Sequence, residues 1–222
     1  MQLVIQGKNL DMIWKYINPK MLFIRHLGGD TELTREIIEE MKQVCRREMK
    51  IYFTWNFYSS KIINQHFKFP SNKDGESITN YLKDDDAALF VVSAGEGIRC
   101  LYNKYKDEGE YLKSHAIQAL ALESAEAAAE WLHQQIRNTW GMPDAIDMTM
   151  MQRFQKRYLG CRYSFGYPAC PDLEMQKPLF DLLRPEHVAL TDGYMMEPEA
   201  SVSAIVIKNP EAKYFKAIME ME

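Results

Sequence analysis

Residues Gly160 to Asp172, GCRYSFGYPACPD, hold the side chains of this chain that are best suited to chemistry. Two prolines and two glycines keep the segment from forming a helix, because each proline lacks a backbone donor and restricts the residue before it. We therefore expect a strand end or a shaped loop that displays its side chains. Arg162 is the leading binding candidate, since a guanidinium fork orients a carboxylate through paired hydrogen bonds. An ordinary surface arginine is the competing interpretation.

Three aromatic residues alternate through this segment, at Tyr163, Phe165 and Tyr167. In an extended chain this alternation places them on a common face, where they would receive a flat ring, although such clusters also form cores. Gly166 would let a ligand approach the backbone, and Pro168 helps to hold the loop in shape. The residues alone support a site for a small zwitterion with a flat ring and a structural corner equally well.

Other kinds of site have weaker support. The five histidines show no i,i+4 pairing and no cysteine at a ligand spacing, so we expect no metal. The four cysteines form no CxxC pair and are expected to be reduced, and Cys161 and Cys170 are expected to be buried structural thiols. The segment SAGEGI lacks the third glycine of a dinucleotide loop, so an ordinary turn is favoured.

Two charged runs have alternative interpretations. The acidic run Asp84 to Asp86 is expected to be a solvated loop. The basic run that leads into the motif contains Arg153, Lys156, Arg157 and Arg162. It is either the solvated face of a helix or a docking site for an acidic protein.

Composition limits the class of protein. The chain has 222 residues, 46% of them apolar and 26% charged, which is typical of a globular protein of one large domain. A net charge of -4 argues against general binding of nucleic acid or anionic membranes. No apolar run reaches the roughly 20 residues that span a bilayer, and no signal for secretion is evident, so we expect a cytoplasmic protein.

The elements that must position the motif follow an α+β pattern. Periodicity predicts strands at 2–7, 21–29, 50–59, 87–98 and 200–207, and helices at 30–49, 110–141 and 174–183. Asp30 or Thr31 can cap the first helix, and Gly141 with Pro143 ends the long one. The alternating run at 200–207 is expected to keep one side solvated or facing a ligand.

The segment RYSFGYPACPD resembles the Arg-x-x-x-Gly-Tyr-Pro-Ala-Cys-Pro-acid signature of the S-adenosylmethionine-binding activation domain of cobalamin-dependent methionine synthase. The preceding AEWLHQQIRNTWG and the following LTDGYMMEPEASVSAIVIKNPEAKYF are similar to the same family. The resemblance implies one activation-like domain over 1–222, with a variable part at 1–110 and an S-adenosylmethionine-binding part at 111–216. The implied fold is α+β, a twisted antiparallel sheet flanked by helices.

Matching positions imply roles for individual residues. Arg162 would hold the methionine carboxylate, the backbone at Ser164 would bond the ligand, and Tyr167 would line the methyl end, where the reaction takes place. The implied cofactor-binding residues are Arg162, Ser164, Gly166, Tyr167, Pro168, Ala169, Tyr214 and Glu126. The family's acidic ligand for the ammonium group has no recognisable counterpart here, and Leu173 stands where full-length methionine synthases carry a histidine.

The resemblance also implies a function, the reactivation of a corrinoid by coupling reduction of cob(II)alamin to methyl transfer from S-adenosylmethionine. A flavodoxin- or ferredoxin-like electron donor is implied. The chain lacks an Asp-x-His-x-x-Gly cobalamin motif, so cobalamin is expected on a separate methionine synthase or another corrinoid protein. The alternative is a non-catalytic module that binds S-adenosylmethionine or a corrinoid protein and regulates its partner.

Overall fold

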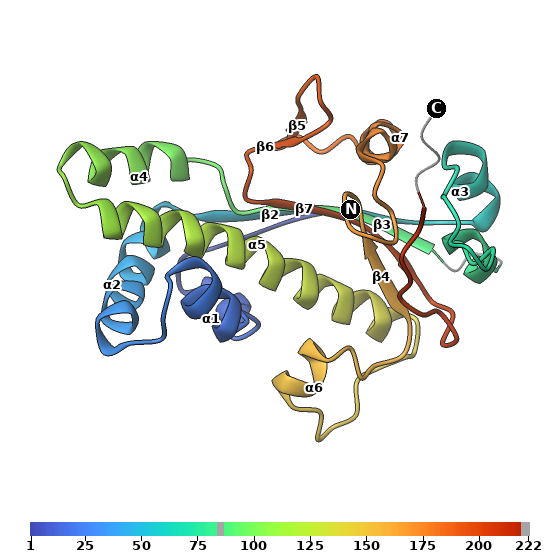
Figure 1. Cartoon of the computed structure of the whole chain (residues 1–222), viewed down its shortest axis with the longest axis horizontal. Helices are drawn as coiled ribbons and strands as arrows, with labels where there is room; N and C mark the ends of the chain where they lie inside the picture. The colour runs from blue at the N-terminus through green and yellow to red at the C-terminus, as the bar shows by residue number, and fades with distance from the viewer. Residues whose placement is uncertain (84–86, 219–222) are drawn as a thin grey trace.

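A five-stranded antiparallel sheet with the order β1-β2-β3-β7-β4 forms the centre of the computed structural model (Figure 1). The structure describes residues 1–83 and 87–218, so the acidic run at Asp84 to Asp86 lies outside the described residues. The strands of the sheet are β1 (Gln2–Gln6), β2 (Lys50–Tyr58), β3 (Ala87–Ser93), β4 (Cys161–Ser164) and β7 (Ser201–Ile207). A separate pair joins β5 (Ala189–Leu190) to β6 (Met196–Glu197). The α+β prediction, with an antiparallel sheet flanked by helices, is confirmed.

Helices cover both faces of this sheet. The α-helices are α1 (Leu10–Trp14), α2 (Glu32–Glu48), α3 (Ser60–His66), α4 (Ile98–Asp107), α5 (Tyr111–Thr139), α6 (Met150–Phe154) and α7 (Gln176–Leu183). Figure 1 shows α5 running across one side of the sheet with α1 and α2 beside it, and α7 on the other side. Three short 3-10 helices lie at Gly7–Asn9, Ile78–Tyr81 and Leu173–Met175. Among the described residues, no helix is long and apolar enough to cross a membrane.

The long helix α5 packs closely on the sheet because its centre is rich in alanine. Ala125, Ala127, Ala128 and Ala129 are each at most 2% exposed, and small side chains allow a close approach of backbones. The apolar core on this side also contains Val202, Ala204 and Val206 of β7. The helix therefore provides a rigid wall beside β7, the strand that pairs with the motif strand β4.

Of the two alternatives for residues 200–207, a solvated side or a side that faces a ligand, the solvated one is wrong. Ser201 and Val202 line the cavity described below. Ile205 and Ile207 belong to a second apolar core on the opposite face of the sheet, which α3 and α7 cover. Strand β7 pairs with β3 on one side and β4 on the other, so it is central and buried on both faces.

The predicted strand at 21–29 is also wrong, because Lys20–His26 forms a π-helix. Pro19 precedes it with φ of -60°, which suits the start of a helix. A short apolar run does not distinguish a strand from a packed helical turn by periodicity alone. Here only Leu22 is fully buried in the segment, and the turn packs against α5 instead of joining the sheet.

Candidate functional site

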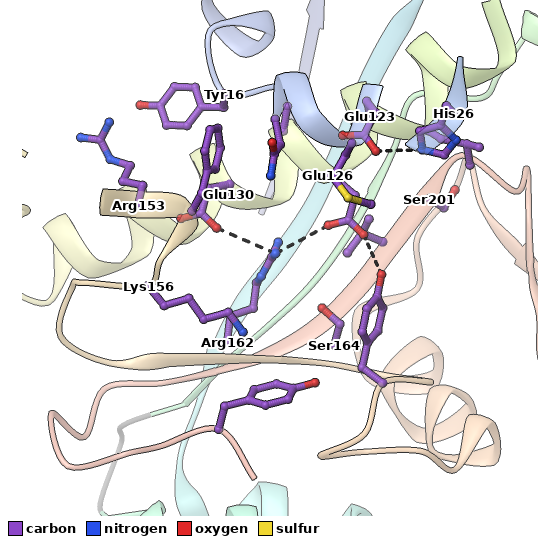
Figure 2. Close-up of a pocket in the computed structure, with 18 of the residues that line it drawn as sticks. Tyr16, His26, Glu123, Glu126, Glu130, Arg153, Lys156, Arg162, Ser164 and Ser201 are labelled. Atoms are coloured by element: carbon purple, nitrogen blue, oxygen red, sulfur yellow. Dashed lines mark hydrogen bonds and ion pairs between the residues drawn. The ribbon is translucent and has the colours of Figure 1, made fainter. Parts of the chain in front are cut away.

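A cavity of about 670 Å³ lies between α5, the strands β4 and β7, the N-terminal segment and the segment after α5. Figure 2 shows the side chains that surround it. Of the residues predicted to bind the cofactor, five line this cavity: Glu126, Arg162, Ser164, Tyr167 and Tyr214. They come from α5, from the motif and from the C-terminal segment, so the fold brings together positions that are far apart in the sequence.

Strand alternation explains why Arg162 and Ser164 point toward the cavity. They pair with Val206 and Ala204 of β7, which belong to the core on the α5 side. Their neighbour Tyr163 points to the other face, where it is fully buried. Because successive side chains of a strand point to opposite faces, the even-numbered residues of β4 form the wall.

Arg162 lies between two carboxylates of α5. Its NH2 atom is 3.6 Å from Glu126 Oε2 and 3.8 Å from Glu130 Oε2 (Figure 2). Only 17% of the arginine side chain is exposed. These distances are long for hydrogen bonds, so the guanidinium is held by charge and remains available for a better-placed acceptor.

Tyr167 lines the cavity and is half exposed. Its hydroxyl donates a hydrogen bond to Glu126 Oε1 at 3.1 Å. The charge of Glu126, together with burial, raises the pKa of Tyr167 to about 12. The phenol therefore stays protonated at neutral pH and serves as a hydrogen-bond donor.

The three aromatic residues of the motif do not share a face, contrary to one of the two interpretations of the sequence. Tyr163 and Phe165 are 0% and 5% exposed and belong to the core on the far side of the sheet. The strand ends at Ser164, and Gly166 then adopts a φ of +81°, which turns the chain before Tyr167. The turn sends Tyr167 to the cavity and leaves the other two rings in the core.

Gly166, Pro168 and Ala169, predicted to bind the cofactor, lie in this turn and not among the side chains that line the cavity. The Gly166 backbone N–H donates to Cys170 O at 2.8 Å, and Pro168 O accepts from Ala217 N–H at 2.8 Å. Ala169 is buried. The structure gives these residues a part in shaping the loop that carries Tyr167.

Sequence reasoning missed the wall that the N-terminal segment provides. Tyr16, Asn18, Met21 and His26 line the cavity. Tyr16 Oη donates to Gln134 Oε1 at 2.5 Å, and His26 Nε2 lies 3.0 Å from Glu123 Oε1, so both residues are attached to α5. No local sequence motif predicts that these four residues line a site, because their role depends on packing against a helix about a hundred residues later.

Two more glutamates of α5 were also missed, although a sequence signal existed. Glu123, Glu126 and Glu130 follow one another at spacings of three and four residues, which places them on one face of a helix. All three line the cavity. In an alanine-rich helix, such a row indicates a polar stripe that faces something other than the core.

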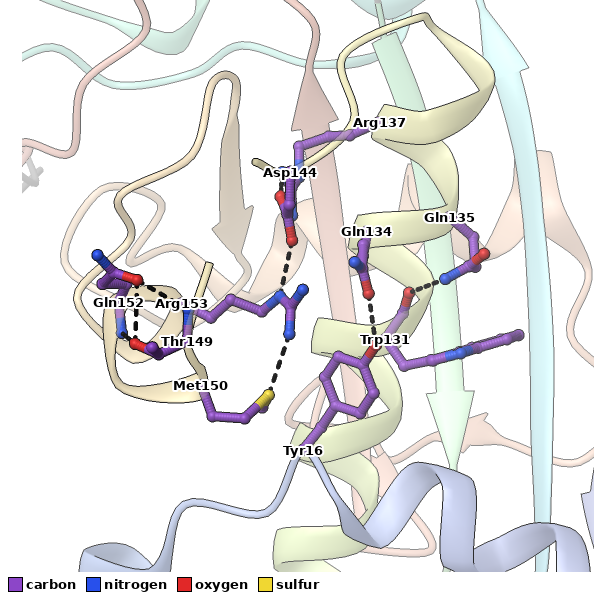
Figure 3. A network of polar contacts seen from close by, with 10 residues as sticks. All are labelled: Tyr16, Trp131, Gln134, Gln135, Arg137, Asp144, Thr149, Met150, Gln152 and Arg153. Carbon is purple, nitrogen blue, oxygen red and sulfur yellow. Dashed lines mark hydrogen bonds and ion pairs between the residues drawn. The ribbon is translucent and has the colours of Figure 1, made fainter. Parts of the chain in front are cut away.

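The segment between α5 and β4 forms another wall and is attached to α5 through Asp144 (Figure 3). The Asp144 carboxylate accepts from Arg137 NH1 and, at 2.7 Å, from Arg153 Nε. Its side chain is only 3% exposed. Burial acts to raise the pKa of Asp144, but the hydrogen bonds and charges of Arg137 and Arg153 outweigh it and hold that pKa below 3.8.

The basic run before the motif does not form one outward face. Arg153 points inward to Asp144, whereas Lys156 and Arg157 are exposed. Lys156 Nζ also lies 4.1 Å from the centre of the Tyr214 ring. The two interpretations of this run therefore apply to Lys156 and Arg157, and Arg153 has a structural partner of its own.

Comparisons with known proteins agree with this arrangement. Residues 47–220 match the family model described as vitamin B12 dependent methionine synthase, activation domain. Methionine synthase of Mycobacterium leprae (strain TN) is 35% identical over 179 residues, and that of Mycobacterium tuberculosis (strain ATCC 25618 / H37Rv) is 37% identical over 175. The alignments cover 67% and 69% of this chain but 14% of each relative.

A solved structure, described as the MetH reactivation domain bound to AdoHcy, has the same fold. It superposes with a TM-score of 0.79 over 97% of this chain and 80% of that chain, at 19% sequence identity. The family match covers most of the chain and includes the motif, α5 and the C-terminal segment that meet at the cavity. This chain therefore belongs to the family of vitamin B12 dependent methionine synthase activation domains.

Proposed function

We propose that this protein binds S-adenosylmethionine and supports the reductive methylation of cob(II)alamin on a separate corrinoid protein or methionine synthase. One observation carries the proposal: the signature residues Arg162, Ser164 and Tyr167 line one cavity together with Glu126 and Tyr214. AdoHcy, the ligand named for the solved structure with this fold, is what remains of S-adenosylmethionine after its methyl group is lost.

The residues of the cavity suit this ligand. Arg162 would hold the methionine carboxylate, and the backbone at Ser164 would bond the ligand. Tyr167, a protonated phenol at neutral pH, would line the methyl end, with its hydroxyl donating a hydrogen bond to Glu126. Tyr214 would provide an apolar surface for the same molecule. A bound ligand held by these groups has its methyl group in a fixed position, which is catalysis by proximity.

The corrinoid belongs to the partner in this proposal, and its cobalt would accept the methyl group. Because the chain spans only 14% of the length of the methionine synthases it matches, their activity is not carried over as a whole. A flavodoxin- or ferredoxin-like donor would supply the electron. We further propose that residues 1–222 act as one domain, since Tyr16 and Tyr214 line the same cavity.

Calorimetry and a turnover assay test this function separately. The isolated protein should bind S-adenosylmethionine without cobalamin, because the cavity lies within this chain. Added to a corrinoid protein in the cob(II)alamin state with reductant and S-adenosylmethionine, it should yield methylcobalamin. Binding without methylcobalamin would favour the non-catalytic regulatory module, and no binding at all would overturn the proposal.

A further inference from the structure

The four glutamates that line the cavity differ in how their charges are compensated. Glu123 lies 3.0 Å from His26, and Glu126 accepts a hydrogen bond from Tyr167 at 3.1 Å. Glu199 is exposed, so water can solvate its carboxylate. Glu130 is only 12% exposed, and within the described part of the chain its one ion pair is with Arg162, at 3.8 Å. Its Oε1 atom is buried without a hydrogen-bond partner among those residues.

Glu126 and Glu130 also oppose each other. They lie one helical turn apart on α5, where two like charges repel. A single guanidinium, that of Arg162, lies between them, so two carboxylates face one cation (Figure 2). We call these three residues the Arg162 bracket. An uncompensated carboxylate in a buried place costs free energy, and a second cation beside Glu130 would remove that cost.

We propose that Glu130 is the residue that recognises the α-ammonium group of the ligand, an inference that rests on the proposed function. In an amino-acid head group the ammonium and the carboxylate are bonded to the same carbon. A ligand carboxylate on Arg162 therefore brings its ammonium next to the bracket, where Glu130 has the least compensated charge. Of the other two basic side chains that line the cavity, Lys156 lies over the Tyr214 ring and Arg153 is paired with Asp144. Glu130 thus selects amino-acid sulfonium ligands over analogues that lack the amino group.

Binding of three ligands to two variants tests this assignment. The ligands are S-adenosylmethionine, an analogue with hydrogen in place of the α-amino group, and decarboxylated S-adenosylmethionine. The wild type should bind S-adenosylmethionine about tenfold or more tightly than the desamino analogue, because a charge-assisted contact is lost. Glu130→Gln should abolish most of that preference and leave the affinity for the desamino analogue unchanged or higher. Arg162→Ala should instead abolish the preference for S-adenosylmethionine over the decarboxylated ligand.

Glu199→Gln is the matched control, since it neutralises an exposed carboxylate of the same cavity and should keep both preferences. Equal affinity of the wild type for S-adenosylmethionine and the desamino analogue would overturn the inference without any variant. It would also be overturned if folded Glu130→Gln, with a wild-type circular dichroism spectrum, kept the preference. Failure of the wild type to bind S-adenosylmethionine would instead refute the proposed function.

Discussion

At the scale of single residues, ligand affinity should depend most on Arg162. Arg162→Ala removes the guanidinium that would hold the ligand carboxylate and leaves Glu126 and Glu130 facing each other. We expect calorimetry to show S-adenosylmethionine binding weakened by about 2 kcal/mol or more. Arg157→Ala removes an exposed cation of the nearby basic run, and this variant should bind S-adenosylmethionine like the wild type. Unchanged affinity of the Arg162 variant for S-adenosylmethionine would show that Arg162 does not hold the ligand carboxylate.

Cys170 is expected to be structural although it lies within the signature. The thiol is fully buried with its Sγ 3.8 Å from Met175 Sδ, and burial raises the pKa of Cys170 to about 12. A thiol in this state is a poor nucleophile at neutral pH. Cys170→Ser should therefore retain much of the methylcobalamin formation of the wild type. Complete loss of that activity in a variant that still binds S-adenosylmethionine would show a chemical role for the thiol.

For the motif, the sequence predicts which side chains share a face only up to the turn at Gly166. An extended chain through Tyr163 and Phe165 requires both rings to share a face, and both lie in the same core. The same argument carried on to Tyr167 is wrong, because the strand stops and Gly166 turns the chain first. The alternation of side chains between two faces belongs to an extended chain and does not continue past a turn.

At the scale of elements, the segment between α5 and β4 should depend on the Asp144 carboxylate. Asp144 bridges Arg137 of α5 to Arg153, which lines the cavity. Because the hydrogen bonds hold its pKa below 3.8, the charged form stabilises the fold above that pH, and the contribution is lost as the pH falls through the lowered pKa. Asp144→Asn should lower the free energy of unfolding at neutral pH by about 3 kcal/mol, since the buried Arg137 and the partly buried Arg153 lose their partner.

Urea denaturation of the wild type and the variant, followed from neutral pH into the acid range, checks this prediction. The difference between them should shrink as the wild-type carboxylate becomes protonated. Asp147→Asn is the control, because Asp147 is an exposed acid in the same segment. A difference that does not depend on pH would mean that the Asp144 charge contributes nothing to stability.

The elements themselves were largely predictable where a long period was present. The pattern of α2 and α5 extends over many residues, and both helices lie where it places them. The segment at 20–26 was not predictable, because four apolar residues fit a strand and a helical turn equally well. Its assignment depends on α5, against which it packs. Packing against α5 therefore determines that this segment is helical, which the local sequence alone does not determine.

At the scale of the whole molecule, the cavity is a product of the chain's topology. Its walls come from the N-terminal segment, α5, the segment that leads into the motif, the motif itself and Tyr214. The first 46 residues lie outside the range matched by the family model, yet they contribute Tyr16 and His26. The motif and the similarity around it therefore predicted the residues on β4 and its turn together with Glu126 and Tyr214, whereas the N-terminal wall required the fold.

An electron donor would approach the outer surface of the protein, so exposed charges beside the cavity should affect its association. Lys156 and Arg157 are exposed beside the cavity walls, and flavodoxin- and ferredoxin-like donors are typically acidic. Rim charges mainly raise the rate of association and are screened by salt. Arg157→Glu should therefore slow reductive activation by a protein donor at low ionic strength and leave S-adenosylmethionine binding unchanged.

Arg157 is the better residue to reverse, because Lys156 also lines the cavity and Arg153 holds Asp144. The defect should disappear at high salt, where the surface charges are screened, and when a strong chemical reductant replaces the protein donor. Lys104→Glu serves as the control, because it reverses an exposed charge on α4 and changes the net charge by the same amount as Arg157→Glu. If both variants are slowed to the same extent, only overall charge matters. If neither is slowed, the basic run is simply a solvated surface.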